Sequence, residues 1–360
     1  MIVTRYPSVT GYSKLSALTP YPIPEKLRNR KVVNLGDGFI LRAIERLLGR
    51  FPPQQLFSPR VAPSPETLVV FDNSPAVILA GANQLNDRYT VWPGLTGSQI
   101  RASKIRFVPF GIGLHGEAGF TDGLSDESID VLRAVHERIE YSSWRCPHTV
   151  AFLQQQLPEL SAKILMTGCP VTYDKPLLED QPFKSATRRI AVTVTERQDF
   201  WRRETAVIDF VARQFRRSQR YLVLHQNYSP PGRFEHIGHR LLPQEAPSLD
   251  PYQKLRRYAV KRGFRVFCPA DADECIKFYS TIDFHIGSRL HAHLLFLSTA
   301  RRSLLVPVDG RSAGMSEFLG FPLCAPGELE AALDFDFEIV RERAKVGFSV
   351  MQQFIKSIPS

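Results

Sequence analysis

The sequence predicts an α/β protein with two Rossmann-like domains that face a cleft. Three observations lead to this prediction. Short apolar runs alternate with stretches at helical spacing, the alternation stops in a polar, proline-containing stretch at residues 173–188, and it then restarts. Strands that alternate with helices form parallel sheets covered on both faces. We therefore predict an N-terminal domain at residues 1–172, a linker at 173–188 and a C-terminal domain at 189–360.

In the first half, an extended arm of about thirty residues, rich in proline and tyrosine, precedes a predicted helix that starts at Asp37 as its N-cap. Apolar runs bounded by glycine, proline or asparagine predict buried strands at TLVVF, AVILAG and IRFVPFGIG. We expect helices at DESIDVLRAVHERI and PHTVAFLQQQL, and a strand at AKILMTGCP that ends in a Gly-Cys-Pro turn.

In the second half, the same patterns predict the strand RIAVTV, the helix ETAVIDFVARQFRR and the strand YLVLH. A proline-rich loop at residues 228–249 follows. The chain then continues with DPYQKLRRYAV (helix), FRVF (strand), DADECIKFYSTI (helix), DFHIG (strand), a helix from about Ser288, SLLVPV (strand) and the short helix SEFLG.

Composition limits the kinds of partner. The formal net charge of +10 suits anionic partners such as nucleic acid, a membrane surface or a phosphorylated substrate. The basic residues are spread along the chain and no nucleic-acid-binding motif is present, so we expect no nucleic acid partner. Five irregularly spaced cysteines predict reduced, mostly buried thiols. No signal peptide or apolar run of about 18 residues is visible, which favours a cytoplasmic protein. A peripheral contact at the inner membrane face through basic residues stays open.

The stretch FHIGSRLHAHLLFL predicts a strand followed by a helix with Ser288 as its N-cap. The first N–H groups of a helix lack intrahelical partners, and this end of the dipole is positive. With Arg289 and His291 in the first turn, the junction forms an anion site at the carboxyl end of a strand. In the alternative interpretation, Arg289 pairs with a carboxylate and the histidines are core or surface groups. His291 and His293 lie two residues apart and point to different sides of the helix, so we expect no metal.

Several motifs resemble, in order, those of the polysaccharide pyruvyl transferase family. They are NLGDGFILRAI, SSWRCPHTVAFL, MTGCPV and DFHIGSRLHAHLLFLSTARRSLLVPVDGRSAGMSEFLG, and together they span about residues 31–320. Two departures stand out. The family commonly has three consecutive glycines where this chain has LAGANQL, which keeps only Gly81, and it usually has lysine where this chain has Arg311. Arginine keeps the charge but not the compact ammonium.

The resemblance implies a fold of the GT-B glycosyltransferase type. It also implies an enzyme that forms a pyruvate ketal on two hydroxyls of a sugar from phosphoenolpyruvate and releases phosphate, with no other cofactor. The acceptor would belong to a cell-surface polysaccharide, an exopolysaccharide or a lipid-linked precursor of either. The implied catalytic residues are His291, as general acid or base, and Asp37, as a base for an attacking hydroxyl. The implied donor-binding residues are Ser288, Arg289, Leu290, Arg197, His225 and Arg311, and the acceptor-binding residues are Asn34, Gly36, Gly81 and Arg145.

Structural explanations remain open for several of these residues. Arg197 fits a surface residue, His225 a packed histidine, and Arg145 a structural arginine, while the Asn34–Asp37 turn fits a simple helix start. Trp92 and Trp144 could stack on a sugar ring or fill the core.

Two other functions also remain open. One is a GT-B-type glycosyltransferase with a nucleotide-sugar donor, in which Glu317 would bind the ribose. The other is a non-catalytic, anion-binding scaffold in a glycan assembly complex. The sequence does not identify the acceptor sugar, the pair of hydroxyls or the oligomeric state.

Overall fold

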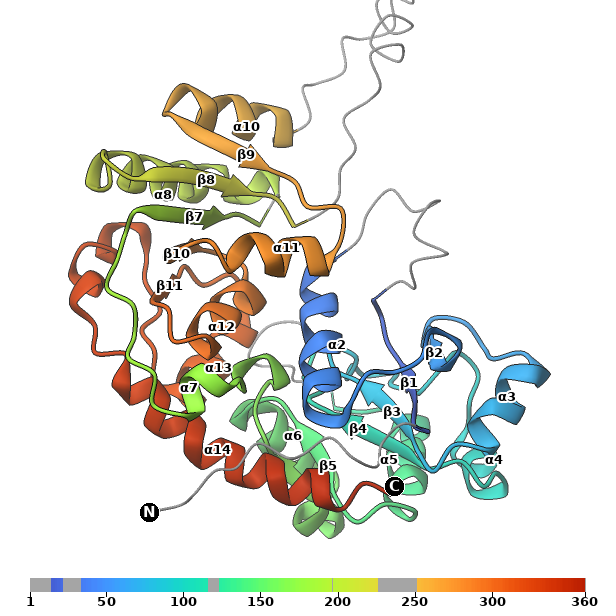
Figure 1. Ribbon diagram of the computed structural model, residues 1–360. Helices are drawn as coiled ribbons and strands as arrows, with labels where there is room; N and C mark the ends of the chain where they lie inside the picture. The colour runs from blue at the N-terminus through green and yellow to red at the C-terminus, as the bar shows by residue number, and fades with distance from the viewer. Residues whose placement is uncertain (1–13, 22–33, 116–122, 196, 226–250, 360) are drawn as a thin grey trace, which may run out of the picture.

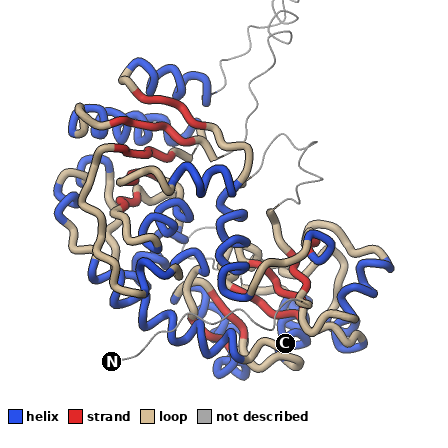
Figure 2. Tube along the Cα trace, in the orientation of Figure 1, coloured by secondary structure: helices blue, strands red, loops and turns tan. Residues whose placement is uncertain are grey.

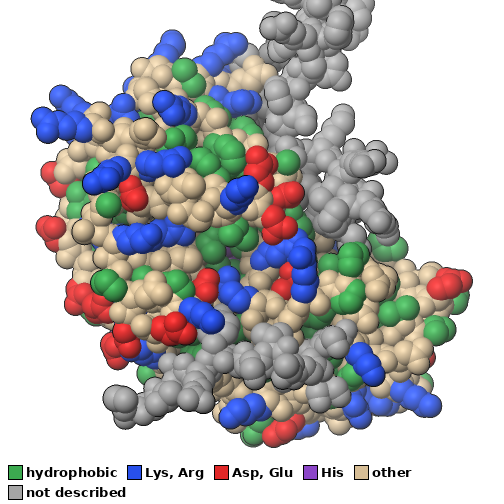
Figure 3. Space-filling view, in the orientation of Figure 1, with side chains coloured by type: hydrophobic (Ala, Val, Ile, Leu, Met, Phe, Trp, Pro, Cys, Tyr) green, Lys and Arg blue, Asp and Glu red, His purple; other side chains and the backbone are tan. Residues whose placement is uncertain are grey.

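The computed structural model describes residues 14–21, 34–115, 123–195, 197–225 and 251–359. The proline-rich loop predicted at 228–249 and most of the N-terminal arm lie outside these residues. Figure 1 shows two α/β halves, with helix α2 running between them and helix α14 passing beneath both. Lys and Arg are interspersed with Asp and Glu over the visible face, which agrees with the scattered basic charge of the sequence (Figure 3).

The first half contains a parallel sheet with the strand order β2-β1-β3-β4. A second parallel pair, β5-β6, continues it, because Ile112 bridges to Trp144 and the Gly111 N–H donates to the Ser143 carbonyl. The strands are β1 (Ser16–Leu18), β2 (Leu56–Phe57), β3 (Val77–Ala80), β4 (Phe107–Phe110), β5 (Ser142–Trp144) and β6 (Ile164–Met166). The helices of this half are α2 (Leu35–Leu48), α3 (Pro65–Asp72), α4 (Gly97–Ala102), α5 (Asp126–His136) and α6 (Pro147–Gln156), and Figure 2 shows them around the strands.

The second half contains a five-stranded parallel sheet with the order β11-β10-β7-β8-β9. This is the Rossmann order, in which the chain changes direction between its first strand, β7, and its fourth, β10. The strands are β7 (Arg189–Thr193), β8 (Gln219–Val223), β9 (Phe264–Phe267), β10 (Phe284–Gly287) and β11 (Ser303–Leu305). The helices are α8 (Trp201–Gln214), α10 (Pro251–Lys261), α11 (Ala272–Tyr279), α12 (Leu290–Ser298) and α13 (Gly310–Leu319).

Helix caps differ from the prediction at both helices that matter for the site. Helix α2 is capped by Asn34, whose side chain accepts from the Gly36 N–H, so Asp37 lies inside the first turn and is not the N-cap. At α12 the N-cap is Arg289 and not Ser288, because the Ser288 N–H still donates to the Thr193 carbonyl beside the strand end. The Asp37 side chain therefore lies in the first turn of α2, at the positive end of the helix dipole. This position stabilises an ionised carboxylate.

Three further predictions were wrong or incomplete. TLVVF lies in helix α3 and not in a strand, because Ser64 caps the N-terminus and Pro65 occupies the first turn. The short helix predicted at SEFLG is the end of the longer α13, which begins after the Asp309 cap. Residues Ser16–Leu18 of the expected extended arm form β1 at the centre of the first sheet.

The C-terminal helix α14 (Glu338–Lys356) was not predicted, and it contacts the first half of the chain. Phe354 packs edge-on against Phe110 at 4.9 Å between ring centroids. Buried Arg341 donates to the carbonyls of Leu177 and Gln181 at 2.6 and 2.5 Å, next to α7 (Lys175–Leu178) in the predicted linker. The end of the chain therefore stabilises the junction of the two halves. Among the described helices, none has the length and hydropathy that a membrane span requires.

Both tryptophans of the first half belong to the core. Trp144 is fully buried in β5, where its indole N–H donates to Ser142 Oγ at 2.7 Å. Trp92 packs against Phe71 and Phe107. At both positions the structure therefore supports a tryptophan that fills the core and not one that stacks on a sugar ring.

Candidate active site

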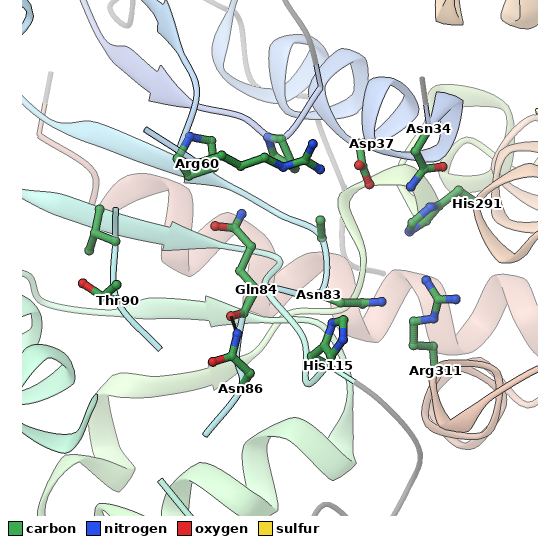
Figure 4. Close-up of a pocket in the computed structure, with 14 residues that line it drawn as sticks. Asn34, Asp37, Arg60, Asn83, Gln84, Asn86, Thr90, His115, His291 and Arg311 are labelled. Carbon is green, nitrogen blue, oxygen red and sulfur yellow. Dashed lines mark hydrogen bonds between the residues drawn. The ribbon is translucent and has the colours of Figure 1, made fainter. Parts of the chain in front are cut away.

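Two cavities lie where the two halves of the chain meet. The larger has a volume of about 420 Å³ and the smaller about 200 Å³, and they share Asn34, His291 and Arg311 in their walls. Figure 4 shows the larger cavity, with Asn34 and Asp37 from α2 on one side and His291 and Arg311 from the second half beside them. The larger cavity is lined by Pro20, Asn34, Asp37, Pro59, Arg60, Ala82, Asn83, Gln84, Asn86, Thr90, Val91, His115, His291 and Arg311.

The smaller cavity lies at the carboxyl ends of β7 and β10, where the Rossmann order changes direction. Its walls include six of the predicted donor-binding residues together with two of the predicted acceptor-binding residues. These are Ser288, Arg289, Leu290, Arg197, His225 and Arg311, with Asn34 and Gly36. The N-terminal turns of α12 and α13 also contribute to it, which adds positive ends of two helix dipoles to the three arginines.

Arg289 is tied to the loop that follows β7. Its Nε donates to the Val194 carbonyl at 2.8 Å and its Nη2 to the Thr195 carbonyl at 3.0 Å. The Arg289 N–H donates to Thr193 Oγ1 at 3.3 Å. The guanidinium therefore has a fixed orientation and brings its charge to the cavity wall, while part of its donor fork is used on the protein backbone.

The other two arginines of the smaller cavity differ in their surroundings. Arg311 is held by Asp309, whose carboxylate accepts from Arg311 Nε at 2.8 Å and also caps α13. Part of the Arg311 charge is therefore balanced within the protein. Arg197 is exposed at the end of β7 and faces the cavity.

His225 lines the smaller cavity, but its ring packs inside the fold. Its Nε2 lies 2.6 Å from the Tyr279 hydroxyl, and Phe39 contacts the ring edge-on. Burial, followed by the charge of Arg289, holds the pKa of His225 well below its usual value. With these contacts, His225 fits a packed histidine, the alternative that the sequence analysis left open.

Of the two predicted catalytic residues, His291 is the one that lines both cavities. Its side chain is buried, and its Nε2 has no hydrogen-bond partner among the described residues. Burial is the main cause that lowers the pKa of His291 to about 3, and the positive charges of Arg145 and Arg311 add to it. The imidazole is therefore neutral at pH 7 when both cavities are free of ligand.

Asp37 faces the larger cavity from the first turn of α2 (Figure 4). Burial raises the pKa of Asp37 to about 6, against the opposing effects of Arg60, a hydrogen bond from Asn34 and Arg311. Titratable groups whose pKa values are shifted by burial within a cavity are typical of acid–base sites. Burial thus raises the pKa of Asp37 and lowers that of His291, and so favours the neutral form of both groups.

Two predicted acceptor-binding residues lie outside both cavity walls. At Gly81, a Cβ atom would lie 2.3 Å from Ile40 Cγ2, so this glycine faces α2. The side chain of Arg145 is buried behind the larger cavity, where its Nη1 donates to Asn83 Oδ1. At the LAGANQL departure, both Gly81 and Ala82 have left-handed backbone conformations, with φ of 60° and 68°.

The sequence analysis missed most of the polar wall of the larger cavity. Asn83 and Gln84 follow the carboxyl end of β3, while Asn86, Thr90 and His115 lie on neighbouring loops. Loop residues have no periodic spacing, so no pattern could identify them. The position of Asn83 just after a predicted strand was the available signal.

Glu317, considered for a ribose site, and His293, considered for a metal site, lie outside both cavity walls. Glu317, proposed as a ribose ligand, is largely exposed, accepts from His148 Nε2 at 2.7 Å and lines neither cavity. His293 is buried, with Nδ1 at 2.7 Å from Ser303 Oγ. In the described part of the chain, no three His, Cys, Asp or Glu side chains group as a metal site would.

The two parallel sheets, with cavities between them at their carboxyl ends, define the two-domain, GT-B-like α/β class that the sequence predicts. The family model for polysaccharide pyruvyl transferase matches residues 34–310. The chain belongs to this family, which confirms the resemblance of its motifs. A search of curated protein sequences gives no match.

A comparison with solved structures gives matches of low similarity. The UDP-GlcNAc 2-epimerase from Neisseria meningitidis, bound to UDP-GlcNAc, has 10% identity, a TM-score of 0.47 and coverage of 95% of this chain and 99% of its own. The S. aureus MnaA–UDP structure has 11% identity, a TM-score of 0.46 and coverage of 95% and 94%. A structure of accessory secretory protein 1, 2 and 3 from Streptococcus pneumoniae has 10% identity, a TM-score of 0.45 and coverage of 81% and 55%, so this chain spans about half of that one. Identities this low say nothing about what this chain binds.

Proposed function

We propose that this protein forms a pyruvate ketal on a sugar, with phosphoenolpyruvate as the donor and phosphate as the leaving group. The observation that carries the proposal is the junction of two cavities at His291. A small cationic cavity and a larger polar one meet at this imidazole, with Asp37 in the wall of the larger one. A transfer between a small anion and a sugar requires such an arrangement, because both reactants must reach one proton-transfer site.

The smaller cavity suits the donor in charge and in size. Phosphoenolpyruvate carries a phosphate and a carboxylate, and Arg197, Arg289 and Arg311 supply positive charge together with the N-termini of α12 and α13. A volume of about 200 Å³ suits a three-carbon phosphate ester better than a nucleotide-sugar. The position of Glu317 outside both cavities also disfavours the nucleotide-sugar alternative.

The larger cavity suits a sugar acceptor. Amide and hydroxyl side chains make up half of its polar wall, and they provide both donors and acceptors for sugar hydroxyls. Its volume of about 420 Å³ lies in the usual range for small-molecule sites. We assign the acceptor to a cell-surface polysaccharide, an exopolysaccharide or a lipid-linked precursor, and the reaction to the cytoplasm, where phosphoenolpyruvate is made.

The proposed chemistry begins with a proton. His291 transfers a proton to the methylene carbon of the donor, which becomes a methyl group and leaves an oxocarbenium-like centre at the neighbouring carbon. A sugar hydroxyl attacks this centre while Asp37 takes its proton. The bond to phosphate then breaks, the second hydroxyl attacks, and its proton leaves with the phosphate. His291 ends one proton short and Asp37 one proton rich, so exchange with solvent restores both.

The free protein contains His291 in its neutral form, so the donor must supply the conditions for its protonation. A bound phosphate and carboxylate place negative charge next to the ring and oppose the effect of the surrounding arginines. Asp37, with a pKa of about 6, is ionised at pH 7 and can act as the base. The cations of the smaller cavity stabilise the departing phosphate.

The test combines the purified protein with phosphoenolpyruvate and a panel of nitrophenyl and lipid-linked sugars. Phosphate release and a product mass that shows one ketal-linked pyruvate are followed for the wild type, His291→Gln and Asp37→Asn. We expect release that requires a sugar and falls at least about 100-fold in both variants. Turnover with uridine nucleotide sugars, without turnover of phosphoenolpyruvate, would support the glycosyltransferase instead.

A further inference from the structure

A hydrogen bond between Asn83 and Arg145 joins the wall of the larger cavity to the buried interior. The proposed chemistry does not use this contact. Asn83 lines the cavity, while Arg145 is 1% exposed and lies behind it. Figure 4 shows the Asn83 side chain reaching into the cavity on the side of Arg311 and His115. Arg145 Nη1 donates to Asn83 Oδ1.

The chemistry of arginine fixes the orientation of this amide. A guanidinium has five N–H donors and no acceptor, so the amide must present its oxygen to Arg145 and its NH₂ group to the other side. That other side is the cavity. Because the charge of Arg145 draws electron density toward the amide oxygen, it also makes the NH₂ group a stronger donor.

Arg145 itself is held in place by the surrounding backbone. A Cβ atom at Gly113 would lie 2.2 Å from Arg145 Nη2, so the guanidinium fits against a backbone position that has no side chain. Arg145 forms no ion pair with a described residue, and its Nε has no partner among them. A buried charge without a counter-ion is costly, which is reason to look for a function for it.

We propose that Asn83 is a specificity-determining residue that donates a hydrogen bond to the acceptor sugar, and that Arg145 is the positioning residue that aims it. The inference rests on the function proposed above. Asn83 lines the larger cavity and not the smaller one, so its ligand is the acceptor and not phosphoenolpyruvate. An N–H donor binds lone pairs. Its partner is therefore an oxygen of the acceptor sugar.

The decisive variant is Asn83→Asp. It keeps an oxygen for Arg145 and strengthens that contact with a full charge, but it replaces the donor with a second oxygen on the cavity side. We expect the acceptor KM to rise roughly 10-fold or more, the phosphoenolpyruvate KM to change less than about 3-fold, and the Tm to stay equal or increase. A purely structural role for Asn83 would leave the acceptor KM unchanged.

Asn83→Ala separates the effect of charge from the loss of the donor. It removes the donor and adds no charge to the cavity, so we expect its acceptor KM also to rise roughly 10-fold. A rise in Asn83→Asp together with a wild-type acceptor KM in Asn83→Ala would mean that charge alone causes the effect, and would overturn the inference.

Arg145 is tested through a double-mutant cycle of Arg145→Met and Asn83→Ala. If Arg145 acts through Asn83, the two losses in acceptor kcat/KM will overlap, and the double variant will resemble the worse single variant. Additive losses would overturn the role of Arg145. Absence of any phosphoenolpyruvate turnover in the wild type would overturn the proposed function, and this inference with it. Wild-type turnover with an unchanged acceptor KM in Asn83→Asp would overturn this inference alone.

Discussion

Burial of Asp37, the proposed base, lowers the stability of the protein at neutral pH. The pKa of Asp37 in the folded protein is about 6, raised chiefly by burial above the usual value of 3.8. Below about pH 4, the Asp37 carboxyl is protonated in both the folded and the unfolded protein, so it does not lower the free energy of unfolding. The cost grows between pH 4 and 6 and is complete above pH 6, where it reaches about 3 kcal/mol.

Asp37→Asn should therefore stabilise the protein at pH 8 and remove its activity. We expect a Tm several degrees above that of the wild type at pH 8, and equal Tm values near pH 4. Thermal unfolding from pH 4 to 8 measures this. Asp72→Asn is the control, because Asp72 is exposed at the end of α3, and it should show no such trend. A Tm difference that does not depend on pH would contradict the assignment.

At Gly36 the first half of the chain comes close to His291 of the second half. Gly36 lies in the first turn of α2, and a Cβ atom there would lie 2.6 Å from His291 Nδ1. The backbone of Gly36 is helical, so alanine fits the local conformation and even favours the helix. The close approach to the imidazole is therefore the reason that a larger residue is excluded.

Gly36→Ala should displace the His291 ring without unfolding the protein. We expect kcat to fall at least about 10-fold, because a displacement of a few tenths of an ångström or more misaligns a proton donor. The Tm should change by no more than a few degrees. Gly327→Ala is the control, since nothing lies within 4 Å of a Cβ atom there. Wild-type kcat in Gly36→Ala would show that the position of the ring does not limit the reaction.

At the scale of elements, the loop after β3 stores backbone strain beside the larger cavity. Ala82 has a φ of 68°, a left-handed conformation that costs a residue with a Cβ atom about 1–2 kcal/mol. Family members commonly have glycine here. The strained turn leads directly into Asn83, so the strain lies where the chain turns from the sheet toward the cavity.

Ala82→Gly should stabilise the protein by up to about 1 kcal/mol, because relief of the strain exceeds the added entropy of the unfolded chain. Ala151→Gly makes the same chemical change at an exposed position inside helix α6, where we expect a loss of about 1 kcal/mol. Urea unfolding of both variants gives the two free energies. A loss at both positions would show that Ala82 is unstrained.

Local signals predicted the elements well where hydrophobic pattern and boundaries agreed. The five strands of the second half were all predicted, because each is a short apolar run between helical patterns. TLVVF failed because its β-branched residues favour a strand, while Ser64 and Pro65 start a helix. Helix α14 was not predicted, although its buried residues Val340, Ala344, Phe348 and Met351 recur at helical spacing and the signal is therefore present in the sequence.

The candidate site was predictable only in part. Motif residues such as His291 and Asp37 do line the cavities, and Arg145 was expected there but lies behind the wall. Whether Arg145 lines the cavity or lies behind its wall depends on how the guanidinium packs against Gly113, and no local sequence pattern encodes this contact. Asn83 was missed for the same reason, since its orientation depends on a partner 62 residues away.

At the scale of the whole molecule, the site exists only where the two halves meet. Asn34 from the first half and His291 and Arg311 from the second line both cavities. Helix α14 and Arg341 connect the second half to the first half and to α7. His291 lines both the cavity proposed for the donor and the cavity proposed for the acceptor, so we expect donor binding to change the charge of this imidazole.

Binding of phosphoenolpyruvate should therefore take up a proton. At 4 Å and an effective dielectric constant of 20, one negative charge contributes about 4 kcal/mol, or about 3 pKa units. Two such charges suffice to carry the pKa of His291 from about 3 past neutrality. Because the pKa rises on binding, affinity should fall as pH increases from 7.5 to 8.5, a range in which the phosphate of the free donor is already ionised.

Calorimetry in buffers with different ionisation enthalpies measures this proton directly. The wild type should take up a substantial fraction of one proton per donor bound at pH 7.5, and His291→Gln should take up clearly less. Asp37→Asn separates the second titratable group, and it should retain most of the uptake because Asp37 faces the larger cavity alone. Equal uptake in the wild type and in His291→Gln would place the proton elsewhere and would remove His291 as the acid that protonates the methylene carbon.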